Sequence, residues 1–547
     1  MDIKQNITDA LHKILKKDIV LEVPPDSALG DYAFPCFNLA KEMRKAPPLI
    51  AQDLIKKLGK IEGVSQIKAT GPYLNFFVNK TDIVEETINT IRKQKDKYGA
   101  SIKKEKIIIE HTSINPNASP HVGRARNALI GDSIVRLMRF NGADVDVRYF
   151  VNDVGKQIAM LVLGSKGKKN VQFDDLLKIY VDINEKSENN SKIEKEVFEL
   201  LNNLEKGDAA TKKKFKDIVD ICIKGQSKIF KELEIEYDKF DYESKFLWDK
   251  KTEEILSKLK KTGKLFEDEE NRLVLNQEGY NIPVKNPVLV LTRADKTSLY
   301  PLRDIAYTIE KMESAKKNII ILGEDQKTYF QQIKAALDLL GYKAPVPVHY
   351  SFVLLAEGKM STRKGNVVLL EDFMKEAVKK AKEKMKKKND KIAKTIAYGA
   401  VKYAILKVSN EKNVMFDLDS ALSFEGDTGP YLQYSYARIC SIFDKYGKKV
   451  PLTADLSLLK DNSEIELVKE LARFPDIVKQ AANELSPYII ANYVFAVAKR
   501  FSEFYHACPI LTEKEELKKA RLILIDAVRQ VLANGLDLLG LKVVEEM

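Results

Sequence analysis

The sequence predicts an α/β protein: a doubly wound parallel sheet in the middle of the chain, with an α+β unit before it and an all-α helical bundle after it. Two observations carry this prediction. Between about residues 104 and 372, short β-branched runs such as "KIIIEH" and "NIIILG" each lead through a polar loop into an amphipathic helix, as in a parallel sheet. From residue 396 onward, apolar residues recur at spacings of three and four, as in packed helices.

Changes in composition divide the chain into three expected units. The N-terminal unit covers residues 1–103, the central unit residues 104–395 and the helical unit residues 396–547. A charged stretch at about residues 161–285 has the pattern of a helical insertion into the sheet. The lysine-rich residues 379–395 mark a boundary, and form either a solvated helix face or a phosphate-contacting helix.

Size and composition exclude several classes of protein. A chain of 547 residues is too long for a single core. No apolar run is long enough to span a bilayer, and the N-terminus alternates charged and apolar residues, unlike a signal peptide. Four scattered cysteines argue against a disulfide framework or a zinc site, and a net charge of +12 favours a polyanionic partner. We therefore expect a cytoplasmic protein that does not bind membranes.

The segment "EHTSINPNASPHVGRARNALIGD" (residues 110–132) leads from a buried strand through a polar loop into a helix. Such a loop lies at the carboxyl end of a strand, where α/β sheets bind ligands. Gly123 allows a ligand close to the backbone, and the helix N-terminus favours phosphate. His121 and Arg124 share the first turn and could both contact phosphate oxygens. The alternative is a polar connecting loop with a capping histidine.

Two short segments resemble the signature motifs of class I aminoacyl-tRNA synthetases. "SPHVGR" (residues 119–124) is similar to the HIGH motif, and "EGKMSTRKGNVV" (residues 357–368) is similar to the KMSKS motif. The context resembles the arginyl-tRNA synthetase family in particular, through "EHTSINPN", "YFVNDVGKQI", "LYPLRDIAY" and "FEGDTGPYLQYSYARICSI". The N-terminal "DSALGDYAFPCFNLAKEMRK" and "GPYLNFF" resemble that family's additional domain. The resemblance covers nearly the whole chain except much of the insertion.

The resemblance implies an architecture and a reaction. Residues 104–395 would be a Rossmann-type class I catalytic domain, residues 1–103 an additional tRNA-binding domain and residues 396–547 an anticodon-binding domain. The enzyme would be an ATP-dependent, AMP-forming arginine–tRNA ligase for protein synthesis. It would activate L-arginine to arginyl-adenylate with release of pyrophosphate, and then transfer arginine to the 2′-hydroxyl of the terminal adenosine of the arginine tRNA.

The resemblance also implies which residues bind ATP and act in catalysis. Phosphoryl chemistry of this kind depends on positioning and on cations near the developing charge. The catalytic candidates are His121, Arg124 and Lys359. The ATP-binding candidates are Pro120, His121, Gly123, Arg124, Lys359, Met360 and Ser361. Mg²⁺ would be carried by the phosphates, since no carboxylate cage is visible, and we expect no metal held by the protein alone.

One departure from the family pattern concerns the second motif. Its second lysine, usually a cation near the transition state, is Thr362 in this chain. Residues 118–120, where some arginyl enzymes carry a substitute lysine, read "ASP". The charge must then come from another cation, and Lys359 and Arg124 are the favoured candidates. Arg363, Lys364 and Lys156 stay open as alternatives.

Recognition of arginine requires a carboxylate for its planar guanidinium. Tyr300 and Asp304 are four residues apart at an expected helix start, so they share one face. Asp304 is otherwise an acid that complements the helix dipole. The resemblance extends the set of arginine-binding candidates, with satisfied loop caps as the alternative for Glu110, Asn115 and Gln326. The full set is Glu110, Ser113, Asn115, Tyr300, Asp304 and Gln326.

The tRNA contacts expected from the resemblance lie in the two outer domains. Splayed bases of single-stranded RNA stack on aromatic side chains. The helical domain offers Tyr431, Tyr434 and the terminal Met547, although tyrosines at helical spacing are more often core residues. The N-terminal domain offers Asn75 and Phe76, and Phe76 could equally belong to the core.

Two further functional readings stay open at this point. One is a class I synthetase for another amino acid such as lysine, which the Tyr300, Asp304 and Glu110 set disfavours. The other is a catalytically inactive tRNA-binding paralogue, which the threonine at position 362 motivates. We expect a monomer whose partners are the arginine tRNA, L-arginine and ATP.

Overall fold

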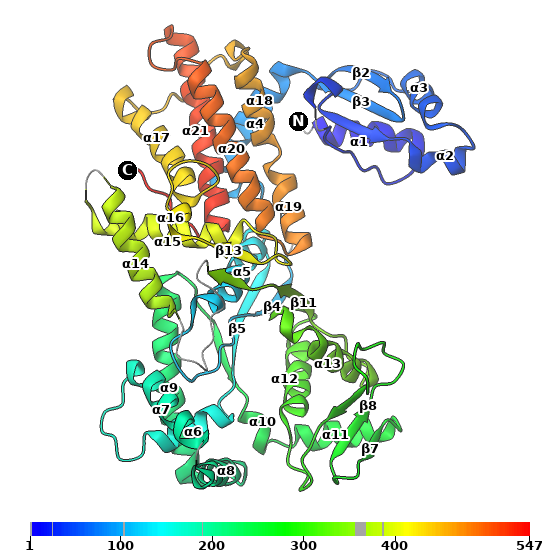
Figure 1. The fold of residues 1–547 in the computed structure, drawn as a ribbon. Helices are drawn as coiled ribbons and strands as arrows, with labels where there is room; N and C mark the ends of the chain where they lie inside the picture. The colour runs from blue at the N-terminus through cyan, green and yellow to red at the C-terminus, as the bar shows by residue number, and fades with distance from the viewer. Residues whose placement is uncertain (1–2, 25, 102–103, 189, 356–367, 386–387) are drawn as a thin grey trace.

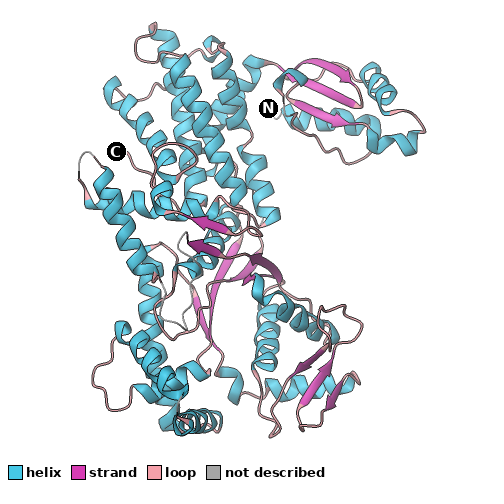
Figure 2. Cartoon of the chain, viewed as in Figure 1, coloured by secondary structure: helices cyan, strands magenta, loops and turns pink. Residues whose placement is uncertain are grey.

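The computed structural model describes residues 3–24, 26–101, 104–188, 190–355, 368–385 and 388–547. Figure 1 shows a small N-terminal unit to one side, a helical bundle beside it, and a sheet region below the bundle. In Figure 2 the strands are confined to the N-terminal unit and the lower part, while the bundle consists of helices. The described chain contains no helix that is both long and apolar enough to cross a membrane.

The N-terminal unit is a three-stranded antiparallel sheet packed against helices. The strand order is β1-β3-β2, so β3 is the central strand. Its core is a separate cluster around Ile7, Leu11, Ile50, Leu74 and Phe76. The elements are α1 (Ile3–Leu15), η1 (Ser27–Leu29), β1 (Tyr32–Pro35), α2 (Phe37–Met43), α3 (Pro47–Lys57), β2 (Val64–Thr70) and β3 (Tyr73–Val78).

The helix that follows the N-terminal sheet belongs to another part of the molecule. Helix α4 (Lys80–Gln94) begins at Asn79, whose side chain accepts hydrogen bonds from Thr81 N and Asp82 N, and η2 (Lys95–Lys97) follows it. Val84, Ile88 and Ile91 of α4 are buried in the large core that also contains the C-terminal helices. The boundary predicted at residue 103 therefore differs from the structure, where the N-terminal core ends near Ile83.

The central sheet is parallel, with the strand order β11-β10-β4-β5-β6. The chain starts in the middle at β4, moves outward to β5 and β6, and then returns to the other side with β10 and β11. This order is doubly wound, as predicted, and the direction of winding reverses between β4 and β10. The strands are β4 (Lys106–Glu110), β5 (Asp144–Val151), β6 (Lys239–Tyr242), β10 (Lys317–Gly323) and β11 (Val346–Tyr350).

The predicted insertion at residues 161–285 is not a single helical unit. Strand β6 lies inside this range but belongs to the central sheet, paired in parallel with β5. The prediction was wrong here because "KFDY" alternates polar and apolar residues over only four positions. The helices before β6 form a lobe with its own core, and are α6 (Lys156–Gly164), η3 (Phe173–Asp175), α7 (Leu176–Glu188), α8 (Ser191–Glu205) and α9 (Ala209–Glu232).

A second lobe follows β6 and lies on the other side of the sheet region (Figure 1). It contains a small antiparallel sheet, β7-β8-β9, and a core shared with α12 and α13. Its elements are α10 (Lys245–Trp248), α11 (Lys251–Lys261), β7 (Leu265–Glu267), β8 (Leu273–Asn276), β9 (Val288–Val290), α12 (Tyr300–Ser314), η4 (Glu324–Gln326) and α13 (Lys327–Leu339).

Helix α5 (Val122–Phe140) is the central helix of the molecule and confirms the helix predicted after the polar loop. It ends at Asn141, and Gly142 adopts a φ of 83°, which costs a glycine little. Burying an aliphatic side chain contributes about 1.5–3 kcal/mol, so the apolar side of α5 anchors the sheet to the bundle. That side holds Ala128, Ile130, Ile134, Val135, Leu137 and Met138, all of them buried.

The C-terminal part is helical almost throughout, as predicted. The predicted boundary at residue 396 falls inside α15, and a short strand, β13, pairs with β12 (Val353–Leu355). The elements are α14 (Leu370–Lys384), α15 (Asp390–Leu406), β13 (Val414–Phe416), α16 (Leu418–Ala421), α17 (Gly429–Tyr446), η6 (Leu456–Leu458), α18 (Asn462–Ala472), α19 (Phe474–Glu484), α20 (Tyr488–Ala507) and α21 (Glu515–Leu538).

Candidate active site

A cavity of about 390 Å³ lies at the carboxyl ends of β4 and β10, where the winding of the sheet reverses. Parallel sheets bind ligands at this position because the strand ends and the loops that follow them form a crevice there. All six predicted arginine-binding residues line this cavity, which confirms that they lie together. They are Glu110, Ser113, Asn115, Tyr300, Asp304 and Gln326.

Three carboxylates in the wall of the cavity bear on its charge: the buried Glu110 and Glu243, which already have cationic partners, and the half-buried Asp304. Glu110, at the end of β4, accepts a hydrogen bond from Nζ of Lys311 on α12. Glu243, directly after β6, accepts from Nε of Arg303 at 2.6 Å. Each of these pairs is almost completely buried, so removing one partner would leave an uncompensated charge.

The third carboxylate, Asp304, accepts a hydrogen bond of 2.5 Å from the neutral hydroxyl of Tyr329. Burial, together with the nearby charges of Glu243 and Glu110, raises the pKa of Asp304 to about 7, while Tyr329 and Lys311 oppose the shift. The raised pKa means that Lys311 and Tyr329 do not fully offset the cost of desolvation and of the two neighbouring carboxylates. The site around Asp304 is therefore suited to a cation that the protein itself does not supply.

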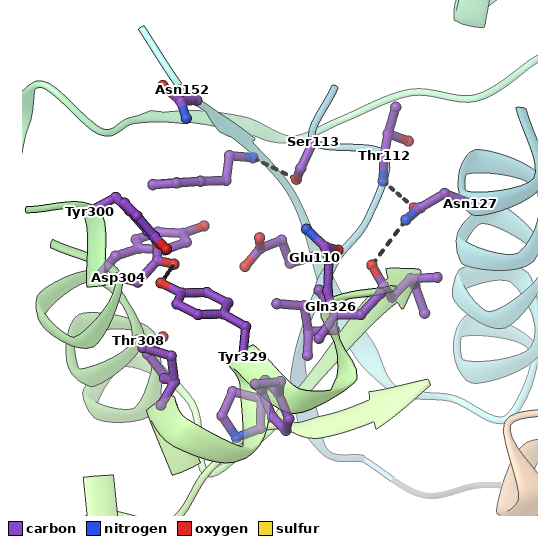
Figure 3. Close-up of a pocket in the computed structure, with 18 of the residues that line it drawn as sticks. Glu110, Thr112, Ser113, Asn127, Asn152, Tyr300, Asp304, Thr308, Gln326 and Tyr329 are labelled. Atoms are coloured by element: carbon purple, nitrogen blue, oxygen red, sulfur yellow. Dashed lines mark hydrogen bonds between the residues drawn. The ribbon is translucent and has the colours of Figure 1, made fainter. Parts of the chain in front are cut away.

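Aromatic rings surround Asp304 on the side of the cavity formed by α12 and α13 (Figure 3). The rings of Tyr300 and Tyr329 have their centroids 5.3 Å apart, and Tyr300 is 53% exposed. Tyr307 stacks on Phe150 at 4.4 Å, deeper in the same wall. A planar cation next to Asp304 would meet ring faces as well as a carboxylate, an arrangement that favours guanidinium over ammonium.

The loop after β4 forms the opposite wall. Thr112 and Ser113 adopt φ values of 71° and 43°, which are strained for residues with a side chain. The Thr112 N–H donates to Asn127 Oδ1 at 2.5 Å, and the Phe150 N–H donates to Ser113 Oγ at 3.1 Å. Asn115 donates from Nδ2 to Oε1 of Gln157 at 3.2 Å. The loop conformation is thus held by contacts with both α5 and the segment after β5.

The first motif lies where the loop enters α5. Pro120 is buried, His121 is the N-cap residue, and Arg124 is exposed and lines the cavity. Burial, reinforced by the charge of Arg124, lowers the pKa of His121 to about 4, so its imidazole is neutral at pH 7. Its Nδ1 is buried and has no hydrogen-bond partner among the described residues. His121 can therefore hydrogen-bond a ligand but does not bring a positive charge.

The N-terminus of α5 has less free hydrogen-bonding capacity than expected. The Val122 N–H donates to Val368 O at 3.1 Å, and the Arg124 N–H donates to His121 O at 2.9 Å. Two of the first three backbone N–H groups of α5 therefore already donate hydrogen bonds within the protein. The third belongs to Gly123, the residue predicted to allow close approach of a phosphate.

Except for its last residue, Val368, the second motif lies outside the described residues, and with it Lys359, Met360, Ser361 and Thr362. The segment directly after it is held against the first motif. His121 and Leu369 form an isolated β-bridge, and the Leu370 N–H donates to Pro120 O at 2.9 Å. The two motifs, more than two hundred residues apart in sequence, are thus linked through their flanking backbone.

Several cavity residues were not predicted from the sequence, among them Glu243, Lys311 and Tyr329. Glu243 was not predicted because the strand before it, β6, was not predicted. The residue after a strand becomes a site candidate only once the strand itself has been recognised. Lys311 lies seven residues after Asp304 on the same face of α12, so helical periodicity could have identified it. Tyr329 on α13 gave no sequence signal.

The predicted tRNA-binding residues of the two outer domains have different surroundings. Tyr434 on α17 is partly exposed, and Arg438 lies 4.7 Å from its ring centroid and 5.1 Å from that of Tyr505 on α20. Tyr431 packs against Phe495, with ring centroids 5.9 Å apart. Met547 is 37% exposed.

Asn75 and Phe76 are buried, and Phe76 has no exposed surface. Both lie on β3, the central strand of the N-terminal sheet, where neighbouring strands and helices cover their side chains. The structure therefore places Phe76 in the core, which was the alternative to direct RNA contact.

Comparisons with known proteins agree with this arrangement, and the fold and the site together define a class I aminoacyl-tRNA synthetase. The family model described as tRNA synthetases class I (R), catalytic domain, matches residues 87–418. The DALR anticodon binding domain matches residues 432–547, and the arginyl tRNA synthetase N terminal domain matches residues 1–78. The chain belongs to the arginyl-tRNA synthetase family.

Individual relatives show how complete the similarity is. The arginine–tRNA ligase of Methanocaldococcus jannaschii is 39% identical, covering 99% of each chain. That of Methanocella arvoryzae is 39% identical over 93% of this chain and 92% of its own. The solved arginyl-tRNA synthetase of Thermus thermophilus is 28% identical, with a TM-score of 0.88 over 100% of this chain and 99% of that one. These matches do not support a lysine enzyme or an inactive paralogue.

Proposed function

We propose that the chain joins L-arginine to the arginine tRNA in two steps, and that the cavity between β4 and α12 binds the arginine. The observation that carries this proposal is Asp304, the half-buried cavity carboxylate whose hydrogen bond comes from a neutral hydroxyl rather than from a cation. The guanidinium of arginine supplies the missing charge and pairs with a carboxylate through two hydrogen bonds.

The orientation of arginine follows from where the polar groups lie. With its guanidinium at Asp304 between Tyr300 and Tyr329, the other end of the amino acid points toward the loop that carries Ser113 and Asn115. That loop leads directly to His121, so the carboxylate of arginine faces the ATP side. Glu110 then acts mainly through its pair with Lys311, because its charge is already compensated.

We infer that ATP binds along the loop from Pro120 to Arg124 and the second motif. Among the described residues, no cluster of three or more His, Cys, Asp or Glu side chains could hold a metal ion. We expect Mg²⁺ to be carried by the phosphates, where it would neutralise part of their charge. His121, being neutral, donates a hydrogen bond to a phosphate oxygen. Arg124 and Lys359 supply the positive charge that Thr362 lacks.

Arg124 is favoured over Lys156 as a supplementary cation. Arg124 lines the cavity and is exposed toward it. Lys156 instead forms an ion pair of 3.1 Å with Glu194 on the surface of the helical lobe. A lysine already paired with a carboxylate brings less net charge to a phosphate.

We propose that anticodon bases stack on the surface formed by Tyr434, Arg438 and Tyr505. Base stacking on aromatic rings and on arginine is the usual way proteins hold unpaired RNA bases. Met547 and the more buried Tyr431 contribute at the edges of this surface. Other exposed groups of the N-terminal domain make its tRNA contacts, since Asn75 and Phe76 are buried.

We also propose that the protein acts as a cytoplasmic monomer. The sheet, the cavity and the helical bundle all belong to one chain. Its four cysteines are free and buried, as suits a reducing compartment. Sedimentation at micromolar concentration tests the monomer, which a dimer mass would contradict.

One assay tests the proposed reaction. Isotope exchange between pyrophosphate and ATP should be observed with arginine and the arginine tRNA together, and should be absent with lysine. Exchange that depends on lysine would overturn the substrate assignment. The absence of exchange with every amino acid, in the presence of tRNA, would overturn the enzymatic function.

A further inference from the structure

Buried polar side chains hold the loop between Glu110 and His121 on the side away from the cavity, and two of them, Gln226 and Tyr237, lie outside every segment that resembles a family motif. Tyr149 lies on β5 and Gln226 lies on α9 in the helical lobe. Both are about 1% exposed. Tyr237, in the connection between α9 and β6, donates from its hydroxyl to Thr112 Oγ1 at 2.7 Å. The helical lobe thus reaches the substrate loop through hydrogen bonds.

Gln226 contacts the backbone of this loop at two points. Its Nε2 donates to Ala118 O at 2.9 Å and to Asn115 O at 3.2 Å. Its Oε1 lies 2.8 Å from the hydroxyl of Tyr149, which also accepts a hydrogen bond from the Ile114 N–H at 3.0 Å. Both amide hydrogens of Gln226 are therefore used, and its Oε1 shares the Tyr149 hydroxyl with Ile114 O, which lies 3.0 Å from that hydroxyl. The two donated hydrogen bonds fix the orientation of the side chain.

The two acceptors, Asn115 O and Ala118 O, lie at the two ends of the part of the loop that connects the proposed arginine site to the proposed ATP site. Asn115 lines the cavity proposed for arginine, and Ala118 directly precedes the residues that lead to His121. The loop also carries the strained backbone of Thr112 and Ser113. Strained conformations persist only when surrounding contacts restrain them. A side chain that hydrogen-bonds both Asn115 O and Ala118 O is therefore placed to control the spacing between the proposed arginine site and the proposed ATP site.

We propose that Gln226 is a positioning residue for the activation step: it sets the distance between the bound arginine carboxylate and the ATP loop by holding the carbonyls of Asn115 and Ala118. This inference rests on the proposed roles of the loop residues. Gln226 touches neither substrate, so it acts through the loop. Reactions that depend on alignment are sensitive to small shifts, and a displacement of about 1 Å can lower a rate about 100-fold.

The chain offers a closely matched control in the helical bundle. Asn534 on α21 is also buried, and its Nδ2 donates to Lys95 O at 3.0 Å and Tyr98 O at 3.5 Å. Its Oδ1 accepts from Gln530 Nε2 at 2.8 Å. Asn534 thus makes the same three kinds of hydrogen bond as Gln226, far from the cavity. An apolar substitution at Gln226 or at Asn534 therefore removes equivalent hydrogen bonds. The bonds of Gln226 hold the substrate loop, whereas those of Asn534 hold backbone of the helical bundle.

The experiment compares Gln226→Met with Asn534→Leu in the full-length enzyme. Both variants should unfold at a lower temperature than the wild type. Gln226→Met should lower kcat for arginylation by about tenfold or more while the KM for tRNA stays within about twofold. Asn534→Leu should leave kcat within about twofold. If Gln226→Met retains wild-type kcat, or if both variants lose kcat equally, the proposal is overturned.

A second variant covers the case in which Gln226→Met does not fold. Gln226→Glu keeps an acceptor for Tyr149, but as a carboxylate it donates nothing to the two carbonyls. Protonation restores one donor, so the activity of this variant relative to the wild type should rise as the pH falls. A ratio that does not change with pH, or failure of both variants to fold, would mean that Gln226 only stabilises the structure.

The site assignment is tested separately with His121→Ala. An impaired His121→Ala beside a fully active Gln226→Met would overturn the positioning role alone. Full activity of His121→Ala would overturn the proposed assignment of the loop itself.

Discussion

At the scale of single residues, the distribution of charge in the cavity supports the proposed binding of arginine. Glu110 and Glu243 each have a buried cationic partner, and Asp304 has the hydroxyl of Tyr329. Burial and the two neighbouring carboxylates hold the pKa of Asp304 at about 7. The free enzyme thus keeps one carboxylate whose ionised form is poorly compensated, and a bound guanidinium would relieve that cost.

Replacing the Asp304 carboxylate should weaken the use of arginine without lowering the unfolding temperature. We expect Asp304→Asn to lower kcat/KM for arginine about 100-fold, which corresponds to about 2.7 kcal/mol, because a charge-assisted pair is lost. At pH 8 its unfolding temperature should not fall, because the substitution removes a half-buried charge that lacks a cation. Steady-state kinetics and thermal unfolding provide the two measurements.

The matched control is Glu243→Gln. This change breaks the buried pair with Arg303 and leaves the guanidinium uncompensated, so the unfolding temperature should fall by about 5 °C or more. A stability loss in Asp304→Asn as large as in Glu243→Gln would contradict the view that Asp304 is reserved for a ligand.

Arginine affinity should depend on pH through the same carboxyl group. Asp304 must be ionised to pair with guanidinium, and its pKa of about 7 lies well above the usual value for an aspartate. Binding should therefore be strongest above pH 7 and weaken as the pH falls, by about tenfold between pH 8 and pH 6. Calorimetric titration of arginine across this range measures the effect. The dependence should vanish in Asp304→Asn, and a pH-independent affinity in the wild type would be inconsistent with the assignment.

At the scale of elements, α5 connects the first motif to the rest of the molecule. Arg126, one turn after His121, has no exposed surface. Its guanidinium donates to Ser351 O and Lys412 O at 2.7 Å each and to Ser409 O at 2.9 Å. These carbonyls belong to the segments before β12 and β13. One buried arginine therefore ties the helix of the first motif to the strand that precedes the second motif.

Removal of this connection should destabilise the protein strongly. In Arg126→Met, several buried carbonyls lose their donor, each at a cost of about 1–3 kcal/mol. We expect the unfolding temperature to fall by about 5 °C or more in differential scanning calorimetry. Arg139→Met serves as the control on the same helix, since Arg139 pairs with Asp238 at the exposed surface. Its change should stay below about 1 °C, and equal losses in the two variants would refute the special role of Arg126.

The other end of α5 connects to the end of the bundle. Ser133 donates from Oγ to Leu538 O at 2.8 Å. Lys402 on α15 is buried and donates to Gly540 O and Leu233 O, at 2.6 Å each. Burial lowers the pKa of Lys402 to about 8, with Asp132 opposing the shift. The catalytic helix, the helical lobe and the C-terminal helices thus meet at one buried polar cluster.

At the scale of the whole molecule, the N-terminal unit is the most separable part. Its core is distinct from the large core shared by the sheet and the bundle. Ion pairs such as Lys469 with Asp31, at 2.5 Å, connect it to α18. The sheet, in contrast, shares its core with the bundle helices through α5 and α15, so these two parts should unfold together.

Deletion of residues 1–78 should therefore leave an active enzyme with weaker tRNA binding. The remaining chain begins at Asn79, which still caps α4. We expect the KM for tRNA to rise about tenfold, equivalent to about 1.4 kcal/mol, and the KM for arginine to stay within about twofold. Arginylation kinetics measure both. An unfolded product, or an unchanged KM for tRNA, would disagree with an independent tRNA-binding unit.

Much of this protein follows from its sequence alone. The β-branched runs predicted the parallel sheet because strands that are buried on both faces consist of nearly continuous apolar residues. The three-and-four spacing predicted the C-terminal helices, and "KIIIEH" followed by the polar loop predicted β4 and α5 with the correct C-cap. The resemblance to the arginyl-tRNA synthetase family identified six residues that do line one cavity. These features are local, so a single stretch of sequence carries enough information to predict each of them.

Other features were decided only by tertiary structure. Strand β6 is stable because β5 pairs with it, not because four residues prefer a strand, and Glu243 became visible only with that strand. The burial of Phe76 depends on β3 being the central strand of its sheet. The elevated pKa of Asp304 and the hydrogen bonds from Gln226 to the loop both depend on groups that are far apart in sequence. Sequence pattern determined which elements form, whereas charge balance and loop position arise from contacts between elements, which only the folded chain brings together.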